Sequence, residues 1–388
     1  MIRKTLVALA AAALLATPAL LATPALLASP ALALDAGTYK VGFVTDNTGP
    51  LAFAGTSFSR GAELAAAEIS AGGYMGAGTM LELVEKEGAG DAARSIQSYN
   101  QLVADRTVLA TSCCILSPIA GALKPIALNN KIPLVIYGAT APGLPSLPYV
   151  YSVTGLPGPA EVAMSKHIAA QAKPQTVAYF VLSDNEAFQG RFKASQAAME
   201  AAGAKTVGVV NVLSADTDFT APATQAIALK PDLMMVYTTQ SPAAGIIAAV
   251  RARGWSGLMS ANDAISPAAV FKKIGPPLAG VPFPVNFSPD ASDTPKAKAF
   301  IAAYTAKHGG APDLYSAQGY TAIWLIAQGL KALPGKPTRE ALAEALNKIT
   351  VLDHDVYGGL PITGGQAETR YTLFLAWTAE GKIVPWKP

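Results

Sequence analysis

The sequence contains only two cysteines, Cys113 and Cys114, and they are neighbours in the chain. A disulfide normally joins positions that the fold brings together, and adjacent cysteines can form one only with a distorted peptide. The two alternatives are a pair of buried free thiols at a strand end, which we expect, and a vicinal disulfide. A metal site is not expected here, because no histidine or third cysteine lies close in the sequence.

Histidine is equally scarce. The three histidines, His167, His308 and His354, stand in helical or loop stretches without a nearby serine, cysteine or aspartate pattern. The chain also lacks a G-x-S-x-G nucleophile motif, a phosphate-binding P-loop and an H-E-x-x-H zinc motif. Without a nucleophile or a metal constellation, we expect a protein that is not an enzyme and that holds no cofactor.

Charge is sparse as well, at 14% of 388 residues and a formal net charge of +3. Lysine and arginine are scattered rather than clustered, which argues against a nucleic acid partner. The hydrophobic content of 51% is too high for a disordered chain, and the length allows two domains with a substantial core. After Asp35 no apolar run approaches about 20 residues, so the mature chain is not expected to span a membrane.

Residues 1–33 differ from the rest of the chain. Arg3 and Lys4 precede an apolar run that contains the repeat LATPAL-LATPAL-LASPAL, and Ala31-Leu32-Ala33 is typical of a signal peptidase site. The alternative, a transmembrane anchor, is disfavoured because three prolines interrupt the helix that it would need. We therefore expect a secretory signal peptide over 1–33, with no cysteine for a lipid anchor at the cleavage point.

From Lys40 onward, apolar runs rich in β-branched residues alternate with helical patterns. This alternation predicts a mainly parallel sheet covered on both faces, and the pattern restarts at Tyr149 as a second unit of the same class. The chain closes with two hairpin-like strands, DVYGGLPIT and RYTLFLAWT. The predicted helices are 59–70, 92–104, 119–129, 159–172, 188–202, 220–229, 243–253, 295–307, 316–331 and 339–348.

One motif imitates a dinucleotide-binding fingerprint. Gly88, Gly90 and Ala93 form G-x-G-x-x-A between a predicted strand and a predicted helix. The fingerprint also requires an acidic residue at the end of the next strand to hold the ribose, and that strand ends in TSCC instead. We interpret the glycines as a tight strand-to-helix turn.

Two α/β units in one exported chain suggest two lobes that face each other across a cleft, with ligands bound beyond the carboxyl ends of the strands. Ser117-Pro118 follows one strand of the first unit and is typical of a helix start, with serine as the N-cap. Thr140 follows the next strand, in IPLVIYGATAP. Each position is either purely structural or offers a hydroxyl and an amide, and together two such strand ends suit a carboxylate.

The chain resembles the periplasmic leucine/isoleucine/valine-binding proteins that serve branched-chain amino acid ABC transporters. The resemblance covers nearly the whole mature chain and depends on the order and spacing of several motifs. These are TDNTGPLAFAGTSFSRGAELAAAEISAGG, NNKIPLVIYGATAPGL, YSVTGLPGPA, SDNEAFQGR and VRARGWSGLMSANDAIS. It implies the fold class α/β, with two Rossmann-like lobes of parallel sheets joined by a three-strand hinge, the Venus-flytrap arrangement of type I periplasmic binding proteins.

The resemblance also implies domain limits. The N-terminal lobe is expected to comprise 36–153 and 284–356, and the C-terminal lobe 154–283 and 357–388. The hinge strands are expected near Val153, near 282–286 and near 357–360.

The family's ligand-binding residues match particular positions of this sequence. Ser117 and Thr140 match the residues that hold the ligand's α-carboxylate. The α-ammonium is held by positions that match the Gly138 carbonyl, the Thr140 hydroxyl and the Asp263 carboxylate. Phe188 matches an aromatic that closes over the ligand, and Gln240 matches a further position of the second lobe.

Phe53 is a candidate wall of the side-chain pocket. The sequence departs from the family pattern at several of these positions. The family often has glutamate at Asp263 and tyrosine at Phe188, and its loop aromatic falls one position after Phe53, at Ala54. Gly90 occupies the place of the partner cysteine in the first-lobe disulfide of some members.

The implied function is an exported, periplasmic, monomeric solute-binding protein that delivers its ligand to the permease subunits of an ABC importer. The expected ligand bears a carboxylate, with an amino acid of apolar side chain as the first candidate. An aromatic or other organic acid, or an amide, is the alternative ligand, and a ligand sensor is the alternative class of protein.

Overall fold

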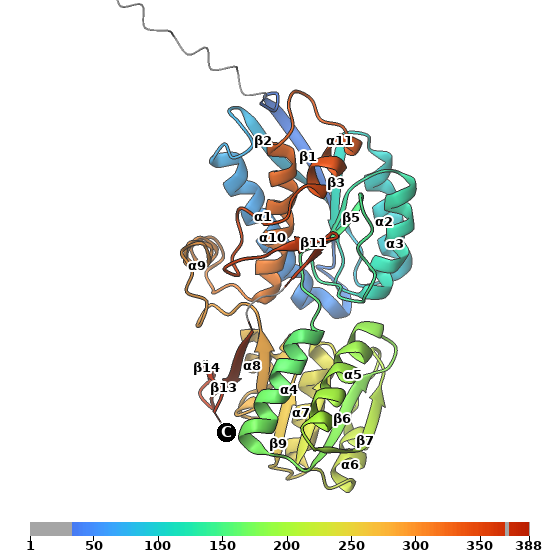
Figure 1. The fold of residues 1–388 in the computed structure, drawn as a ribbon, viewed down its shortest axis with the longest axis vertical. Coiled ribbons are helices and arrows are strands. Elements are labelled where there is room, and N and C mark those ends of the chain that lie inside the picture. The colour runs from blue at the N-terminus through green and yellow to red at the C-terminus, as the bar shows by residue number, and fades with distance from the viewer. Residues whose placement is uncertain (1–32, 369–371, 388) are drawn as a thin grey trace, which may run out of the picture. The chain divides into compact units, whose positions relative to one another are not determined.

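The structure is a computed structural model that describes residues 33–368 and 372–387 (Figure 1). The predicted signal peptide therefore lies outside the described residues, apart from Ala33. Nearly all the predicted helices are present within a few residues of their expected limits. One short helix, α8 (Ala268–Ile274), escaped prediction. Within the described part of the chain, no helix is long and apolar enough to cross a bilayer.

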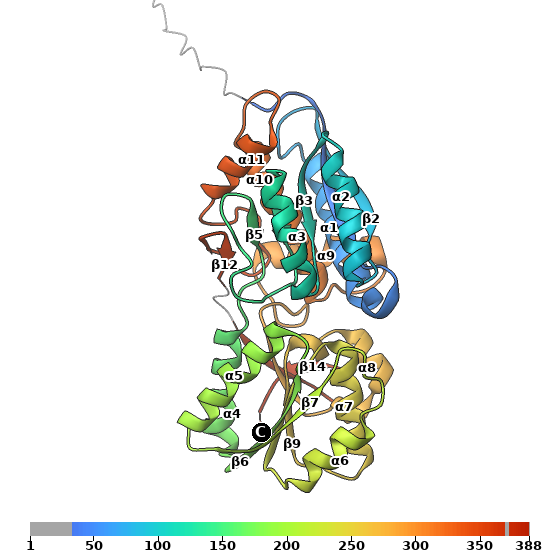
Figure 2. The same cartoon turned by 90° about the vertical axis from the view of Figure 1, so that its right-hand side faces the viewer.

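The first lobe is built on a seven-stranded sheet in the order β11-β12-β5-β4-β3-β1-β2. Strands β1 to β5 pair in parallel, as predicted. Helix α1 packs against α10 and α2 against α3, so that helices cover both faces of the sheet (Figures 1 and 2). Its first elements are β1 (Gly37–Thr45), η1 (Gly49–Leu51), α1 (Ala52–Ala71), β2 (Thr79–Glu87), α2 (Ala92–Ala104), β3 (Val108–Cys113), α3 (Ser117–Asn129), β4 (Leu134–Ile136) and β5 (Val150–Ser152). Its later elements are α9 (Pro295–His308), α10 (Leu314–Lys331), α11 (Arg339–Asn347), β11 (Ile362–Thr363) and β12 (Gln366–Ala367).

Glycine permits the close crossing of α1 and α10. A Cβ atom at Gly61 would lie 1.9 Å from the carbonyl oxygen of Ser316, and one at Gly319 would lie 2.1 Å from that of Phe58. Side chains at these positions are therefore excluded by backbone atoms that have no room to move. The crossing holds the beginning of α1 beside the beginning of α10, where the candidate site lies.

The second lobe has two smaller sheets. Four parallel strands follow the order β7-β6-β8-β9, and three antiparallel strands the order β10-β13-β14. The buried strands β6 and β8 consist almost entirely of apolar residues, as expected for parallel strands covered on both faces. The elements are α4 (Gly158–Ala172), β6 (Thr176–Leu182), α5 (Glu186–Ala201), β7 (Lys205–Val212), α6 (Thr220–Ala228), β8 (Leu233–Tyr237), α7 (Gln240–Ala252), β9 (Leu258–Ala261), η2 (Asp263–Ile265), α8, η3 (Pro276–Leu278), β10 (Pro282–Val285), β13 (Leu373–Trp377) and β14 (Ile383–Pro385).

The expected limits of the lobes need one substantial correction. Residues 357–388 were assigned as a whole to the C-terminal lobe, but β11 and β12 belong to the first-lobe sheet, where Gln366 pairs with Ser152. The chain therefore still belongs to the first lobe at Ala367 and belongs to the second lobe from Leu373, so the expected crossing near 357–360 is wrong. Strands of two residues carry too little hydrophobic alternation to be assigned to a sheet from sequence.

The expected state of the two cysteines also needs correction. Cys113 and Cys114 form a vicinal disulfide rather than two free thiols, and both are buried. Successive side chains of a strand point to opposite faces, but β3 ends at Cys113 and Cys114 has a φ of 140°. This departure from strand geometry brings the two sulfur atoms together.

Candidate functional site

A cavity of about 610 Å³ lies where loops and helix starts of the two lobes meet. The first lobe contributes the beginning of α1, the turn before α3 and the segment after β4. The second lobe contributes the beginning of α5 and the turns after β7, β8 and β9. Nearly all of these segments follow the carboxyl ends of parallel strands, the position at which open α/β sheets bind ligands.

Six of the seven residues singled out from the sequence line this cavity. Ser117, Gly138 and Thr140 come from the first lobe, and Phe188, Gln240 and Asp263 from the second. The structure thus brings together positions that are far apart in the chain. Apolar side chains complete the wall, among them Leu51, Ala54, Phe58, Ile115, Phe188 and Leu314.

Phe53 does not line this cavity. It is 37% exposed and borders a separate cavity of about 420 Å³, whereas Ala54 faces the candidate site. The reason is that α1 already begins at Ala52, so that successive side chains point about 100° apart around the helix axis. The expectation that Phe53 forms a wall of the site is therefore corrected, and the cavity is wider at Ala54 than an aromatic there would leave it.

Ser117 links the two strand ends of the first lobe. It is the first residue of α3, and Leu116 is the N-cap, so the expected capping role of Ser117 is corrected. Its Oγ instead accepts hydrogen bonds from the backbone amides of Thr140, at 3.3 Å, and Ala141, at 3.1 Å. Both Ser117 and Thr140 are more than nine-tenths buried. The Ser117 hydroxyl proton remains available to an acceptor in the cavity, as a hydroxyl has one donor besides its acceptor lone pairs.

The small residues after β4 are explained by close contacts. A Cβ atom at Gly138 would lie 2.9 Å from Cζ of Phe58 and 3.3 Å from the carbonyl oxygen of Cys114. Phe58 in turn packs against Tyr137 and Tyr315, with ring centroids 4.4 and 5.2 Å apart. Glycine therefore lets this aromatic cluster approach the backbone beside Thr140.

Arg191, on α5, was not identified from the sequence. Its Nη1 donates to Oδ1 of Asp263 at 2.7 Å and to Oε1 of Glu161 at 3.0 Å. The guanidinium also lies over the ring of Phe188, 5.5 Å from its centroid. The signal that could have revealed it is spacing, because residues three apart on a helix share a face and Arg191 follows Phe188 by three.

Burial and the neighbouring charges shift the pKa values of Glu161 and Arg191. Burial raises the pKa of Glu161 to about 8, although the Arg191 guanidinium opposes the shift, and the charge of Asp263 adds to it. Burial tends to lower the pKa of Arg191, but the two carboxylates outweigh it and raise that pKa overall. Arg191 thus remains a cation, with Asp263 as its principal counter-ion.

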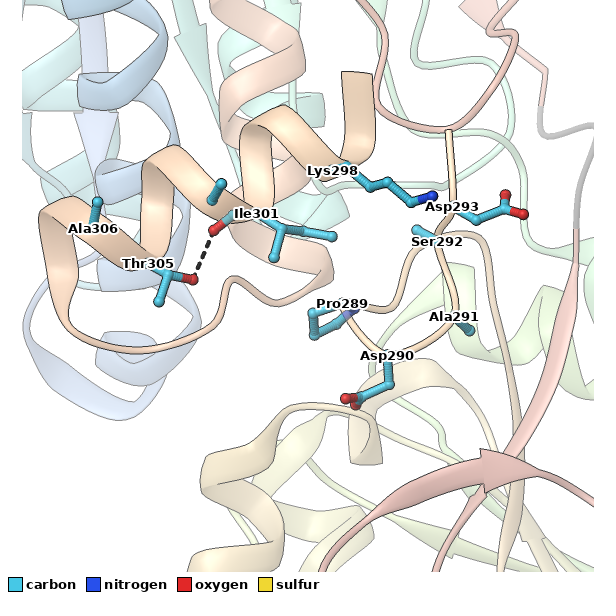
Figure 3. Close-up of a pocket in the computed structure, with 10 residues that line it drawn as sticks. Pro289, Asp290, Ala291, Ser292, Asp293, Lys298, Ile301, Thr305 and Ala306 are labelled. Carbon is cyan, nitrogen blue, oxygen red and sulfur yellow. Dashed lines mark hydrogen bonds between the residues drawn. The ribbon is translucent and has the colours of Figure 1, made fainter. Parts of the chain in front are cut away.

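A separate groove lies elsewhere and holds none of the predicted site residues. It measures about 690 Å³, between the loop 289–293 and α9 (Figure 3). Lys298 points toward that loop, and Thr305 Oγ1 donates to the carbonyl of Ile301 at 2.7 Å, so the hydroxyl is used within its own helix. In residues 33–368 and 372–387, no group of three or more side chains is arranged to hold a metal ion.

Known structures share this fold. A leucine-binding protein from Thermotoga maritima superimposes with a TM-score of 0.81 at 21% identity, covering 89% of this chain and 97% of that one. An ABC transporter solute-binding protein from R. palustris in complex with benzoate gives a TM-score of 0.80 at 19% identity, covering 90% and 95%. The predicted fold class, that of type I periplasmic binding proteins, is confirmed.

Sequence comparison extends the likeness beyond the fold. The chain is 25% identical over 350 residues to the Leu/Ile/Val-binding protein homolog 3 of Brucella melitensis, covering 89% of this chain and 92% of the relative. The model of the family described as periplasmic binding protein matches residues 38–379. These relatives are solute-binding proteins, in agreement with the expectation that the chain is not an enzyme. The chain belongs to the periplasmic binding protein family.

Proposed function

We propose that this protein is the solute-binding component of an ABC importer and that it captures an amino acid with an apolar side chain. The observation that carries the proposal is the pairing of opposite polarities across one cavity. Ser117 and Thr140 line it from the first lobe and carry hydroxyl groups, and Asp263 lines it from the second lobe and carries a carboxylate. A zwitterion needs donors at its acid end and acceptors at its amino end, because a buried unpaired charge is costly.

The acid end would be held by the first lobe. The Ser117 hydroxyl, the Thr140 hydroxyl and nearby backbone amides are the donors that we assign to the ligand's carboxylate. Hydrogen bonds to charged groups contribute about 1.5–3 kcal/mol each. Four or five of them, less the cost of ordering, reach the roughly −8 kcal/mol of micromolar binding.

The amino end and the side chain would be held by residues of both lobes. We assign the ammonium to the Gly138 carbonyl, the Thr140 hydroxyl and the Asp263 carboxylate, and contacts with the ligand to Phe188 and Gln240. Because Asp263, Phe188 and Gln240 lie on the second lobe and the other groups on the first, a closed form would satisfy every group, and the ligand would shift the population toward it. The permease would recognise that form, in the periplasm after export.

Two relatives support the ligand class. The Brucella melitensis relative is named as a Leu/Ile/Val-binding protein homolog, and the Thermotoga maritima structure is that of a leucine-binding protein. The test is a thermal-shift panel of amino acids, aromatic acids and amides on the mature protein, because ligand binding raises apparent stability by mass action. Stabilisation by apolar amino acids supports the proposal, and stabilisation by none of them refutes it.

A second candidate ligand is an aromatic or other organic acid. It is favoured by the ion pair between Asp263 and Arg191, which already gives Asp263 a cationic partner, and by the benzoate complex of the R. palustris protein. In that case Asp263 would meet a hydroxyl group or water. Stabilisation by aromatic acids but not by amino acids in the same panel would identify this candidate.

A further inference from the structure

The two oxygens of Asp263 have different surroundings. Oδ1 accepts from Arg191 Nη1 at 2.7 Å and from Asn262 Nδ2 at 3.2 Å. Oδ2 has no hydrogen-bond partner among residues 33–368 and 372–387. The side chain is 26% exposed and lines the cavity. Oδ2 is therefore the oxygen that a donor group of a ligand would reach.

The negative charge of Asp263 is balanced before any ligand arrives. Arg191 is 8% exposed, remains a cation and donates directly to Asp263. Glu161 adds little negative charge near neutral pH, since burial raises its pKa to about 8. The other charged side chains of the cavity, Lys273 and Asp216, are of opposite sign. A donor at Oδ2 thus meets a neutral ion pair rather than an isolated carboxylate.

This balance has a consequence for ligand choice. An isolated carboxylate strongly favours an ammonium group over a neutral donor, because the attraction between unit charges is added to the hydrogen bond. Next to an ion pair most of that added attraction is cancelled. A hydroxyl group can donate to Oδ2 as an ammonium can, and it loses much less hydration when it is buried.

We propose that the cavity binds α-hydroxy acids as well as α-amino acids of the same carbon skeleton, because Arg191 neutralises the charge of Asp263. The inference rests on the proposed function and names its ligand class more closely. Arg191 is in this account a specificity-determining residue that acts through Asp263. The acid end of either ligand is held in the same way, at Ser117 and Thr140.

Three probes of one skeleton test the proposal by titration calorimetry on the mature protein. They are L-leucine, L-leucic acid, which has a hydroxyl in place of the amino group, and isocaproic acid, which has neither. We expect leucine and leucic acid to bind within about tenfold of each other, and both at least about tenfold more tightly than isocaproic acid, which leaves Oδ2 unpaired. A preference for leucine over leucic acid above that limit overturns the inference.

The variant Arg191→Met provides a second test of the inference. Removing the guanidinium leaves Asp263 as an uncompensated carboxylate, so the preference for leucine over leucic acid should rise at least about tenfold. Lys193→Met is the matched control, because Lys193 is exposed on the same helix and does not line the cavity. An unchanged preference in Arg191→Met, or an equal change in both variants, contradicts the inference.

Different experimental outcomes would refute the proposed function and the inference about α-hydroxy acids. If the wild-type protein binds no apolar amino acid of the thermal-shift panel, the proposed function is refuted and the inference with it. If it binds leucine and strongly rejects leucic acid, only the inference is refuted. If Arg191→Met does not fold, the ratio of the wild-type affinities alone decides.

Discussion

Oγ of Ser117 accepts a hydrogen bond from the backbone amide of Ala141 over 3.1 Å, and by this contact the start of α3 is tied to the segment that follows β4. The amide of Thr140 makes a second, longer bond to the same oxygen. The two strand ends that we assign to the ligand's carboxylate are therefore held in a fixed relation before the ligand binds. Such preorganisation reduces the ordering cost of binding.

Ser117→Ala and Thr140→Ala should each weaken any carboxylate ligand, whatever its side chain. Each change removes a donor to a charged group, which is worth about 1.5–3 kcal/mol, or roughly ten- to a hundredfold in affinity. Calorimetric titration with the tightest ligand of the panel measures the effect. Thr305→Ala is the control, because its hydroxyl bonds only within α9. Wild-type affinity in both site variants would place the ligand elsewhere.

Ser117→Ala should also lower stability. The amides of Thr140 and Ala141 lose their common acceptor in a buried setting, and an unsatisfied buried donor costs about 1–3 kcal/mol. Urea unfolding without ligand should show this loss for Ser117→Ala. Thr140→Ala should show little of it, because that change leaves both amide bonds intact.

Asp263→Asn should weaken amino acid binding at least about tenfold and leave the fold intact, because Arg191 loses its counter-ion and its positive charge then opposes the ligand's ammonium group. Circular dichroism checks the fold, and titration calorimetry the affinity. Asp293→Asn, an exposed change of the same kind, serves as the control. Unchanged affinity in Asp263→Asn would remove this residue from the site.

Gly61→Ala should be strongly destabilising, because the added methyl group would lie 1.9 Å from the carbonyl oxygen of Ser316 and would force α1 and α10 apart. The matched control is Gly121→Ala, at an exposed position of α3 with no atom within 4 Å of the new Cβ. Since alanine is the better helix former, Gly121→Ala should stabilise the protein by up to about 1 kcal/mol. Similar unfolding midpoints for the two variants would contradict the close crossing.

Asp46 should make stability depend on pH. Burial raises its pKa from 3.8 to about 6, against the effect of the Gly90 amide, which donates to Oδ1, and with a smaller contribution from the charge of Glu87. The folded protein therefore binds the proton more tightly than the unfolded chain. This contribution to stability is fully present below pH 3.8 and is lost as the pH rises through about 6.

Asp46→Asn tests that linkage. The amide keeps an acceptor for Gly90 and cannot ionise, so the variant should lose this pH dependence. At pH 7 it should be more stable than the wild type by up to about 3 kcal/mol, the equivalent of the pKa shift. Urea unfolding between pH 4 and pH 7 measures both proteins. Parallel pH profiles would contradict the assignment to Asp46.

Much of the fold could be predicted from the sequence because its elements are long and periodic. The apolar strands and the helices that follow them gave the parallel sheets, and the strand ends gave Ser117 and Thr140. The two-residue strands β11 and β12 could not be assigned, since their place depends on pairing with distant residues such as Ser152. Local patterns contain no information on such a contact.

Errors within the site have a similar cause. Phe53, rather than Ala54, was predicted to line the cavity. The start of α1 decides which of the two faces it, and helix limits are the least certain part of a sequence-based prediction. Arg191 was missed because an arginine on a helix is usually exposed. Its burial depends on Glu161 and Asp263, which lie 30 and 72 positions away in the chain.

The most direct measurement is a crystal structure of the mature protein with the tightest ligand of the thermal-shift panel. The account predicts that the ligand's acid group lies within hydrogen-bonding distance of the hydroxyls of Ser117 and Thr140, with Asp263 and Phe188 against its other end. An acid group bound far from Ser117 and Thr140 would contradict it.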